Sequence, residues 1–290
     1  MNYVLHIVAL LNIYIILVLG ANITVGMAGL LTLCQAAFYG IGAYVGAMFL
    51  MQFELPFVII ALIVAIVTGI SSLLISYASL KLKNDYFTLA TLGFQMIVYT
   101  ILYNWVDVTN GPYGISGIPP IRLLGICNLK GAAAYAFFSS VVMLAMVGIF
   151  VVLKKSPYGR LLRAIRSDET AVTALGRNVA AAKTKAFFIS ASFSGIAGLI
   201  YASYVSFIDP TSFTLNESLF IICALFIGGV GSAKGSISGA LFVVILPEVL
   251  RLVGMPESIA TPIREIVYGI ALIFVMFVRP KGIIGEEIVM

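Results

Sequence analysis

The stretch FVIIALIVAIVTGISSLLISYASL, residues 57–80, contains no charged side chain and is long enough to cross a bilayer as one helix. Apolar stretches recur along the chain, at residues 3–19, 23–50, 57–80, 86–105, 132–153, 186–207, 217–231, 236–250 and 262–278. Backbone groups in lipid must be satisfied within the protein, which leaves helix bundles or closed barrels. Because strict two-residue alternation is absent, these stretches predict helices.

The composition supports the same fold class. Of the 290 residues 61% are hydrophobic and only 10% are charged, with a mean hydropathy of +1.11. A soluble domain is typically about a quarter charged, so this chain has too little polar surface to cover a globule in water. We therefore expect an all-α, polytopic transmembrane helix bundle of about 8–10 helices. We expect residues 1–290 to form one domain.

Some of these stretches have unusual lengths. Residues 23–50 are long for a simple span, whereas 217–231 and 236–250 are short. A broken or re-entrant helix gives the same pattern, so both a continuous and a broken second helix stay open. Residues 3–19 lack the basic start of a signal peptide and are followed by more apolar sequence, so we expect a retained helix.

Positive charge predicts the orientation, because cytoplasmic loops of membrane proteins carry an excess of Lys and Arg. With residues 154–185 in the cytoplasm, alternating spans leave only Arg122, Lys130, Arg251 and Arg264 outside. The cytoplasmic side then holds Lys81, Lys83, Lys154, Lys155, Arg160, Arg163, Arg166, Arg177, Lys183, Lys185, Lys234, Arg279 and Lys281. This places the N-terminus outside and the C-terminus inside. It also accounts for the net charge of +5 without nucleic acid.

The loop over residues 154–185 is polar yet carries signals of ordered helices. Ser156 and Pro157 are typical of an N-cap and a first helical residue. Ser167 predicts a second N-cap, with Asp168 and Glu169 in the first turn, where negative charge suits the helix dipole. Gly176 suits the C-terminal stop of this short helix. Its apolar residues form a stripe of Ala171, Val172 and Leu175.

A helix of about two turns is not stable alone in water, where isolated helices need roughly 12–15 residues. It must therefore pack on another surface. That surface is either the membrane and the chain's own helix ends, or a groove on a cytoplasmic partner. The spacing of the residues leaves both possibilities open.

The loop sequence GRLLRAIRSDETAVTALGRN, residues 159–178, resembles that of branched-chain amino acid ABC transporter permeases. Further motifs match the second, or M, type of these permeases. They are NDYF at 84–87, TLGF at 91–94, GISGIP at 114–119, GGVGSAKG at 228–235, LPE at 246–248 and RPKG at 279–282. The motifs are individually weak but specific in this order, and they extend over nearly the whole chain.

The resemblance implies a permease that pairs with a second permease, two ATP-binding subunits and an extracytoplasmic substrate-binding protein. It implies that the loop helix receives the stroke of the ATPases, through Arg163, Arg166, Asp168, Glu169, Ala171, Val172, Leu175, Gly176 and Asn178. ATP would bind to the partners, which agrees with the lack of a G-x-x-x-x-G-K-[ST] motif here. No cofactor and no catalytic activity are expected of this chain.

Polar residues in the apolar stretches are costly in lipid, so each is a candidate for the transport path or for packing between helices. The path candidates are Asn22, Thr32, Gln35, Tyr86, Phe87 and Thr91. The family usually shows Ser-Leu-Gly-His where this chain has Thr32-Leu33-Cys34-Gln35. Importers of urea and short-chain amides are built from similar permeases, so those substrates stay open beside branched-chain amino acids.

Other classes of protein fit less well. A stand-alone secondary transporter or channel would carry intramembrane charges and would need no docking loop. The chain has one His and three Cys residues without metal-ligand spacing, so no metal site is expected. An enzyme is disfavoured because no nucleophile–base pair is recognisable.

Overall fold

The computed structural model describes residues 2–53, 55–79, 84–123, 127–128, 131–252, 257–278 and 282–283. Among them, five helices are long and apolar enough to cross a membrane. They are Tyr3–Met27, Phe57–Tyr77, Tyr86–Asn104, Ala132–Lys155 and Val179–Val205. Leu215–Gly228 and Glu265–Val275 are shorter apolar helices. The prediction of an all-α transmembrane bundle is confirmed.

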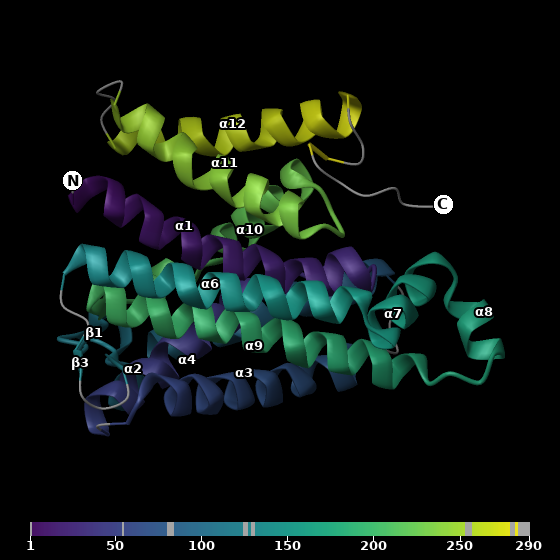
Figure 1. Ribbon diagram of the computed structural model, residues 1–290, viewed down its shortest axis with the longest axis horizontal. Helices are drawn as coiled ribbons and strands as arrows, with labels where there is room; N and C mark the ends of the chain where they lie inside the picture. The colour runs from purple at the N-terminus through teal and green to yellow at the C-terminus, as the bar shows by residue number, and fades with distance from the viewer. Residues whose placement is uncertain are drawn as a thin grey trace.

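The long helices lie side by side along the long axis of the molecule (Figure 1). In chain order the elements are α1 Asn2–Ala21, the π-helix η1 Asn22–Met27, α2 Gln35–Gln52, α3 Phe57–Ser79, α4 Asn84–Asn104, α5 Val106–Thr109, the 3-10 helix η2 Gly111–Tyr113, β1 Ile115–Ser116, β2 Arg122–Leu123, β3 Cys127–Asn128, α6 Ala132–Lys155, α7 Pro157–Ser167, α8 Glu169–Ala174, α9 Val179–Val205, β4 Phe207–Ile208, the 3-10 helix η3 Pro210–Phe213, α10 Leu215–Gly228, α11 Ala233–Leu252 and α12 Glu257–Val278.

The two ends of the bundle are built differently. At the end where α1 begins, short antiparallel strands pair Ile115 with Ile208 and Arg122 with Asn128. At the opposite end, α7 and α8 project beyond the long helices (Figure 1). The connection between α6 and α9 is therefore the part of the chain that stands farthest out on that side.

The structure divides the first two predicted segments at a different place. The first helix does not stop at residue 19 but continues through the π-helix to Met27. The chain turns at Gly29, whose φ of +71° is in the region that favours glycine, and α2 starts only at Gln35. The predicted stretch 23–50 is thus interrupted, as the broken-helix alternative anticipated.

The interruption lies inside the bundle. The side chain of Gln35 contacts Ser190 and Ser194, which lie near the middle of α9. Because helices that end within a bundle leave polar backbone groups without intrahelical partners, this region needs partners from other helices.

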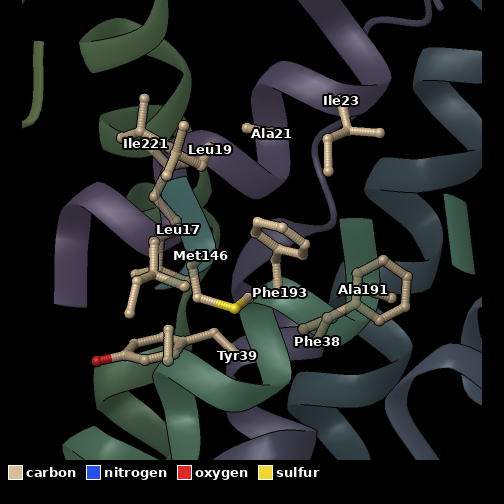
Figure 2. Close-up of a cluster of buried hydrophobic side chains, with 14 of the residues drawn as sticks. Leu17, Leu19, Ala21, Ile23, Phe38, Tyr39, Met146, Ala191, Phe193 and Ile221 are labelled. Carbon is tan, nitrogen blue, oxygen red and sulfur yellow. The ribbon is translucent and has the colours of Figure 1, made fainter. Parts of the chain in front are cut away.

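The core forms around α9, the most buried of the long apolar helices. Helices α1, α2 and α3 pack against it. Glycines allow α2 and α9 to cross closely, since a Cβ on Gly42 would collide with the backbone of Gly195. Figure 2 shows side chains of α1, η1, α2, α6, α9 and α10 gathered in one apolar cluster, among them Leu17, Ile23, Phe38, Met146, Phe193 and Ile221.

Candidate functional site at the loop helices and the helix break

The start of α7 agrees with its predicted signals. The hydroxyl of Ser156 accepts a hydrogen bond from the backbone N–H of Gly159 at 3.1 Å, and Pro157 is the first helical residue. Leu162 and Ile165 are buried, whereas Arg163 is exposed. The apolar side of this amphipathic helix therefore packs on the bundle.

The N-cap of α8 is Asp168 and not, as predicted, Ser167. The Asp168 carboxylate accepts hydrogen bonds from the backbone N–H groups of Thr170 at 2.9 Å and Ala171 at 3.0 Å. Ser167 is the last residue of α7, and its hydroxyl donates to the carbonyl of Arg163. Asp168 takes the cap because its backbone is extended, as a cap requires. The bonds from the Thr170 hydroxyl and the Ala171 N–H hold the pKa of this exposed carboxyl below its usual value.

The end of α8 matches the predicted glycine stop. Gly176 has a φ of +75°. Its N–H donates to the carbonyl of Thr173 at 2.9 Å, and the N–H of Arg177 donates to that of Val172 at 3.4 Å. This pair of bonds is the Schellman motif. Asn178 then caps α9 by accepting from the N–H of Ala181 at 3.0 Å.

The predicted apolar stripe of α8 does not form one face. Val172 is buried against the rest of the chain, whereas Ala171 is exposed and 80% of Leu175 is exposed. Glu169 also faces the chain itself, where its carboxylate pairs with the ammonium of Lys183 in α9 at 2.6 Å. The stripe is split because Val172 and the ion pair attach α8 to its own subunit, which leaves Ala171 and Leu175 for another surface.

Arg166 also faces inward. Its guanidinium is partly buried and donates to the carbonyl of Gly26, at the end of η1. Arg166 is among the residues that the resemblance implicates in coupling to the ATPases, and its contact here is with the membrane part of the same chain.

Asn22 joins η1 to the turn between α10 and α11. Its amide nitrogen donates to the carbonyl of Ser232 at 3.0 Å and to the hydroxyl of Ser236 at 2.7 Å. Its amide oxygen accepts from the N–H of Gly231 at 2.8 Å. All the hydrogen-bonding groups of this buried side chain are therefore used in packing contacts in this conformation.

Gln35, the first residue of α2, is buried within a similar network. Its amide nitrogen donates to the hydroxyl of Ser190 at 2.9 Å, and more weakly to that of Thr24 at 3.5 Å. Its amide oxygen accepts from the hydroxyl of Ser194 at 2.7 Å. The hypothesis that Gln35 faces the transport path stays a prediction, and in this conformation its side chain is held between helices.

The first backbone N–H groups near the start of α2 have side-chain partners from distant helices. The N–H of Ala36 donates to the Ser218 hydroxyl at 2.9 Å, and that of Ala37 donates to the Gln95 amide oxygen at 2.6 Å. The N–H of Leu33 donates to the hydroxyl of Thr91 at 3.0 Å. Thr91 is predicted from the sequence as a candidate, whereas Gln95 and Ser218 are not, because an isolated polar residue in an apolar stretch does not reveal its partner.

The remaining path candidates, Thr32, Phe87 and Tyr86, lie in different surroundings. Thr32 lies in the break, and its buried hydroxyl has no hydrogen-bond partner among the described residues. Phe87 is buried and packs edge-on against Phe187, with 5.6 Å between the ring centroids. Tyr86 is exposed instead. Asn22, Thr32, Gln35 and Thr91 thus surround the helix break, and the two aromatic residues do not join them.

No group of three His, Cys, Asp or Glu side chains that could hold a metal ion occurs in the described ranges. The arrangement offers buried hydroxyl, amide and carbonyl groups around an interrupted helix, and a capped helix outside the bundle.

Comparison with known proteins assigns the chain to a family. Residues 3–276 match the family described as branched-chain amino acid transport system / permease component. The high-affinity branched-chain amino acid transport system permease protein LivM of Salmonella typhimurium is 33% identical, over 94% of this chain and 68% of that protein. LivM of Escherichia coli is 33% identical over 96% and 69%, and its LivH is 24% identical over 96% and 93%.

No solved structure matches the chain. The family match covers nearly all of the chain and agrees with the motifs and the helical membrane fold. The chain therefore belongs to the family of permease components of branched-chain amino acid transport systems.

Proposed function

We propose that this chain is the transmembrane permease subunit of an ATP-driven ABC importer for branched-chain amino acids. It forms the translocation path with a second permease and has no catalytic activity of its own. Two cytoplasmic ATP-binding subunits hydrolyse ATP, and an extracytoplasmic binding protein delivers the substrate. Residues 1–290 act as one permease domain. The family membership supports this proposal, as do the relatives LivM and LivH, each named as a permease protein of a high-affinity branched-chain amino acid transport system.

The observation that carries the coupling part of the proposal is the position of α8. This helix of 6 residues projects from one end of the bundle (Figure 1). It is anchored on one side by Val172 and by the Glu169–Lys183 ion pair. Its other side presents Ala171 and Leu175, small enough for a shallow groove on an ATPase.

The proposed orientation has the N-terminus outside the cell membrane and α7, α8 and the C-terminus in the cytoplasm. Two features support it. The start of α1 lies at the end of the bundle opposite to α8 (Figure 1). The segment from Lys154 to Lys185, rich in Lys and Arg, lies at the α8 end. Lys81, Lys83, Lys130, Arg279 and Lys281, which also entered the prediction, lie outside the described residues.

The test of coupling is Ala171→Arg. An arginine at this exposed position introduces bulk and an unpaired charge into the proposed contact, a penalty of about 2–5 kcal/mol where the contact is desolvated. We expect the ATP-binding subunits to be lost on purification and uptake to stop, while the permease still inserts in the membrane. Ala164→Arg makes the same exchange at an exposed position of α7 and should leave assembly intact. Wild-type assembly and uptake with Ala171→Arg would refute coupling through α8.

The test of the substrate is uptake of labelled leucine in a strain that lacks this chain. We expect leucine uptake to be lost and to return with the wild-type chain and its partner subunits. Unchanged leucine uptake together with lost urea or amide uptake would reassign the substrate within the same class of importer. Uptake by the chain without any ATP-binding subunit would instead indicate a stand-alone transporter.

A further inference from the structure

Two arginines of α7 make the same kind of bond in different surroundings. Arg160 is exposed, and its guanidinium donates to the carbonyl of Lys155, in the preceding helix, at 3.0 Å. Arg166 is partly buried, and its guanidinium donates to the carbonyl of Gly26, 140 positions away in the chain. The first bond is local to the loop, whereas the second joins the loop to the membrane part of the protein.

The carbonyl of Gly26 lies at the C-terminal end of η1. The last carbonyls of a helix have no partner within it and carry the negative end of the helix dipole. A guanidinium is suited to this position because it donates a hydrogen bond and brings positive charge. Arg166 therefore completes the end of η1 in a way that a neutral side chain does not.

The backbone at this contact is also close-packed. A Cβ at Gly29, in the turn after η1, would lie 2.8 Å from Cγ of Arg166. The φ of Gly29 is +71°, a backbone conformation that residues with a side chain rarely adopt. The aliphatic part of Arg166 thus packs on the turn while its guanidinium binds the helix end. A movement of this end of α7 cannot leave η1 unaffected, because close-packed contacts transmit displacement.

The other contacts of η1 lead into the helix break. Asn22 binds the turn between α10 and α11, through Gly231, Ser232 and Ser236. Thr24 contacts Gln35, the first residue of α2. The π-helix is thus attached to the polar residues that surround the break. Segments of π-helix are rare and frequently lie at functional sites.

We propose that Arg166 is the positioning residue through which a movement of α8 reaches the helix break. This inference rests on the proposed function. Arg166 closely precedes Asp168, the N-cap of α8, so a displacement of α8 by an ATP-binding subunit displaces the end of α7. The guanidinium carries that displacement to the Gly26 carbonyl, and η1 then shifts the start of α2 together with the α10–α11 turn. Arg166 thereby serves transmission of the ATPase stroke and not docking of the ATPase.

The test compares Arg166→Gln, Arg166→Lys and the control Arg160→Gln in the full importer reconstituted in lipid vesicles. The measured quantities are co-purification of the ATP-binding subunits, ATP hydrolysis, and leucine imported per ATP hydrolysed. We expect Arg166→Gln to assemble and hydrolyse ATP but to import about tenfold less leucine per ATP, within the usual range of coupling between sites. Arg166→Lys keeps a cationic donor and should recover most of the coupling, and Arg160→Gln should match wild type.

A wild-type amount of leucine imported per ATP with Arg166→Gln would overturn the inference. Loss of the ATP-binding subunits, with ATP hydrolysis per remaining complex unchanged, would also overturn it, because that result assigns Arg166 to docking. Should Arg166→Gln fail to reach the membrane, Gly29→Ala tests the same contact from the other side. It leaves the guanidinium in place and should also lower the leucine imported per ATP, and wild-type coupling there would refute the relay. A wild-type complex without ATP-dependent import would contradict the proposed function instead.

Discussion

Two of the interruptions between helices, the corner between α7 and α8 and the break before α2, are satisfied in opposite ways. At the corner between α7 and α8, Asp168 caps backbone N–H groups that lie 2 and 3 positions away in the chain. At the break before α2, the partner of the Ala36 N–H lies 182 positions away, and Gln35 reaches Ser190 across 155 positions. The start of α8 is thus capped by a neighbouring residue of the sequence, whereas the break is completed by other helices.

The difference follows from the solvent. Outside the bundle, water forms hydrogen bonds with any backbone group that the local sequence leaves unpaired. A short segment with its own caps is therefore enough to satisfy the backbone there. Inside the membrane no water replaces a missing partner, and every polar group must find one within the protein. Substitutions at the break should therefore destabilise the whole bundle, whereas substitutions at the two ends of α8 should affect α8 alone.

Asn22→Ala should have the largest effect on stability. It removes three hydrogen bonds, to Gly231, Ser232 and Ser236, and takes from the Gly231 N–H the amide oxygen that accepts from it. We expect the free energy of unfolding to fall by about 3 kcal/mol. Unfolding of the purified chain in detergent measures it. The control is Asn104→Ala, because Asn104 is exposed and its side chain bonds the Thr100 carbonyl of its own helix. Equal stability of the two variants would show that the polar contacts of the break contribute no more than an exposed local bond.

Gln35→Leu should come next, at about 2 kcal/mol. Leucine keeps the volume of the side chain but removes the partner of the Ser194 hydroxyl, whereas Ser190 retains its bond to the Gly20 carbonyl. The same unfolding measurement applies. A variant as stable as wild type would indicate that the Gln35 network contributes little to packing.

A cysteine at position 35 tests whether Gln35 also faces the transport path. With Cys34 replaced, the new thiol should resist a water-soluble reagent in the conformation described here, because Gln35 is buried. If the residue lines the path, reaction should occur in another nucleotide state of the importer. A thiol that stays inert in every nucleotide state would assign Gln35 to packing alone.

Gly176→Val should act on the loop only. The position requires a φ of +75°, and no atom lies within 4 Å of where a Cβ would be, so the cost is conformational. We expect roughly 1–2 kcal/mol, confined to α8. Hydrogen exchange of the α8 amides should accelerate while global unfolding is unchanged. Gly176→Asn is the control, since Asn tolerates the left-handed region. Loss of global stability with Gly176→Val would show that α8 and the bundle unfold together.

The smallest effect concerns pH at the Asp168 cap. The pKa of this carboxyl is lowered in the folded protein, so its contribution is present at neutral pH. It is lost as pH falls from the ordinary value of 3.8 through the lowered pKa. We expect the Thr170 and Ala171 amides to lose protection against hydrogen exchange over that window. Asp168→Asn keeps a good cap without this titration and should show no such step. A step of equal size in Asp168→Asn would exclude Asp168 as its cause.

The sequence predicted the loop helices well because their signals are local. Ser156, Pro157 and Gly176 act on residues within a few positions, so their types and spacing carry most of the information. The one misplaced cap, Ser167 in place of Asp168, arose because both residue types are good caps and only the backbone conformation separates them. The inward side of α8 could not be predicted, because it depends on Lys183 and on packing against the bundle.

The sequence by itself determined that the chain is a membrane helix bundle, because apolar stretches of sufficient length leave no other fold for a backbone in lipid. Its motifs, taken together, also indicated the family. Only the tertiary structure decided where the second segment breaks, which polar groups complete the break, and that Arg166 points into the bundle. Those outcomes depend on which helices lie side by side, and in lipid a polar group is satisfied by whichever neighbour the packing brings to it.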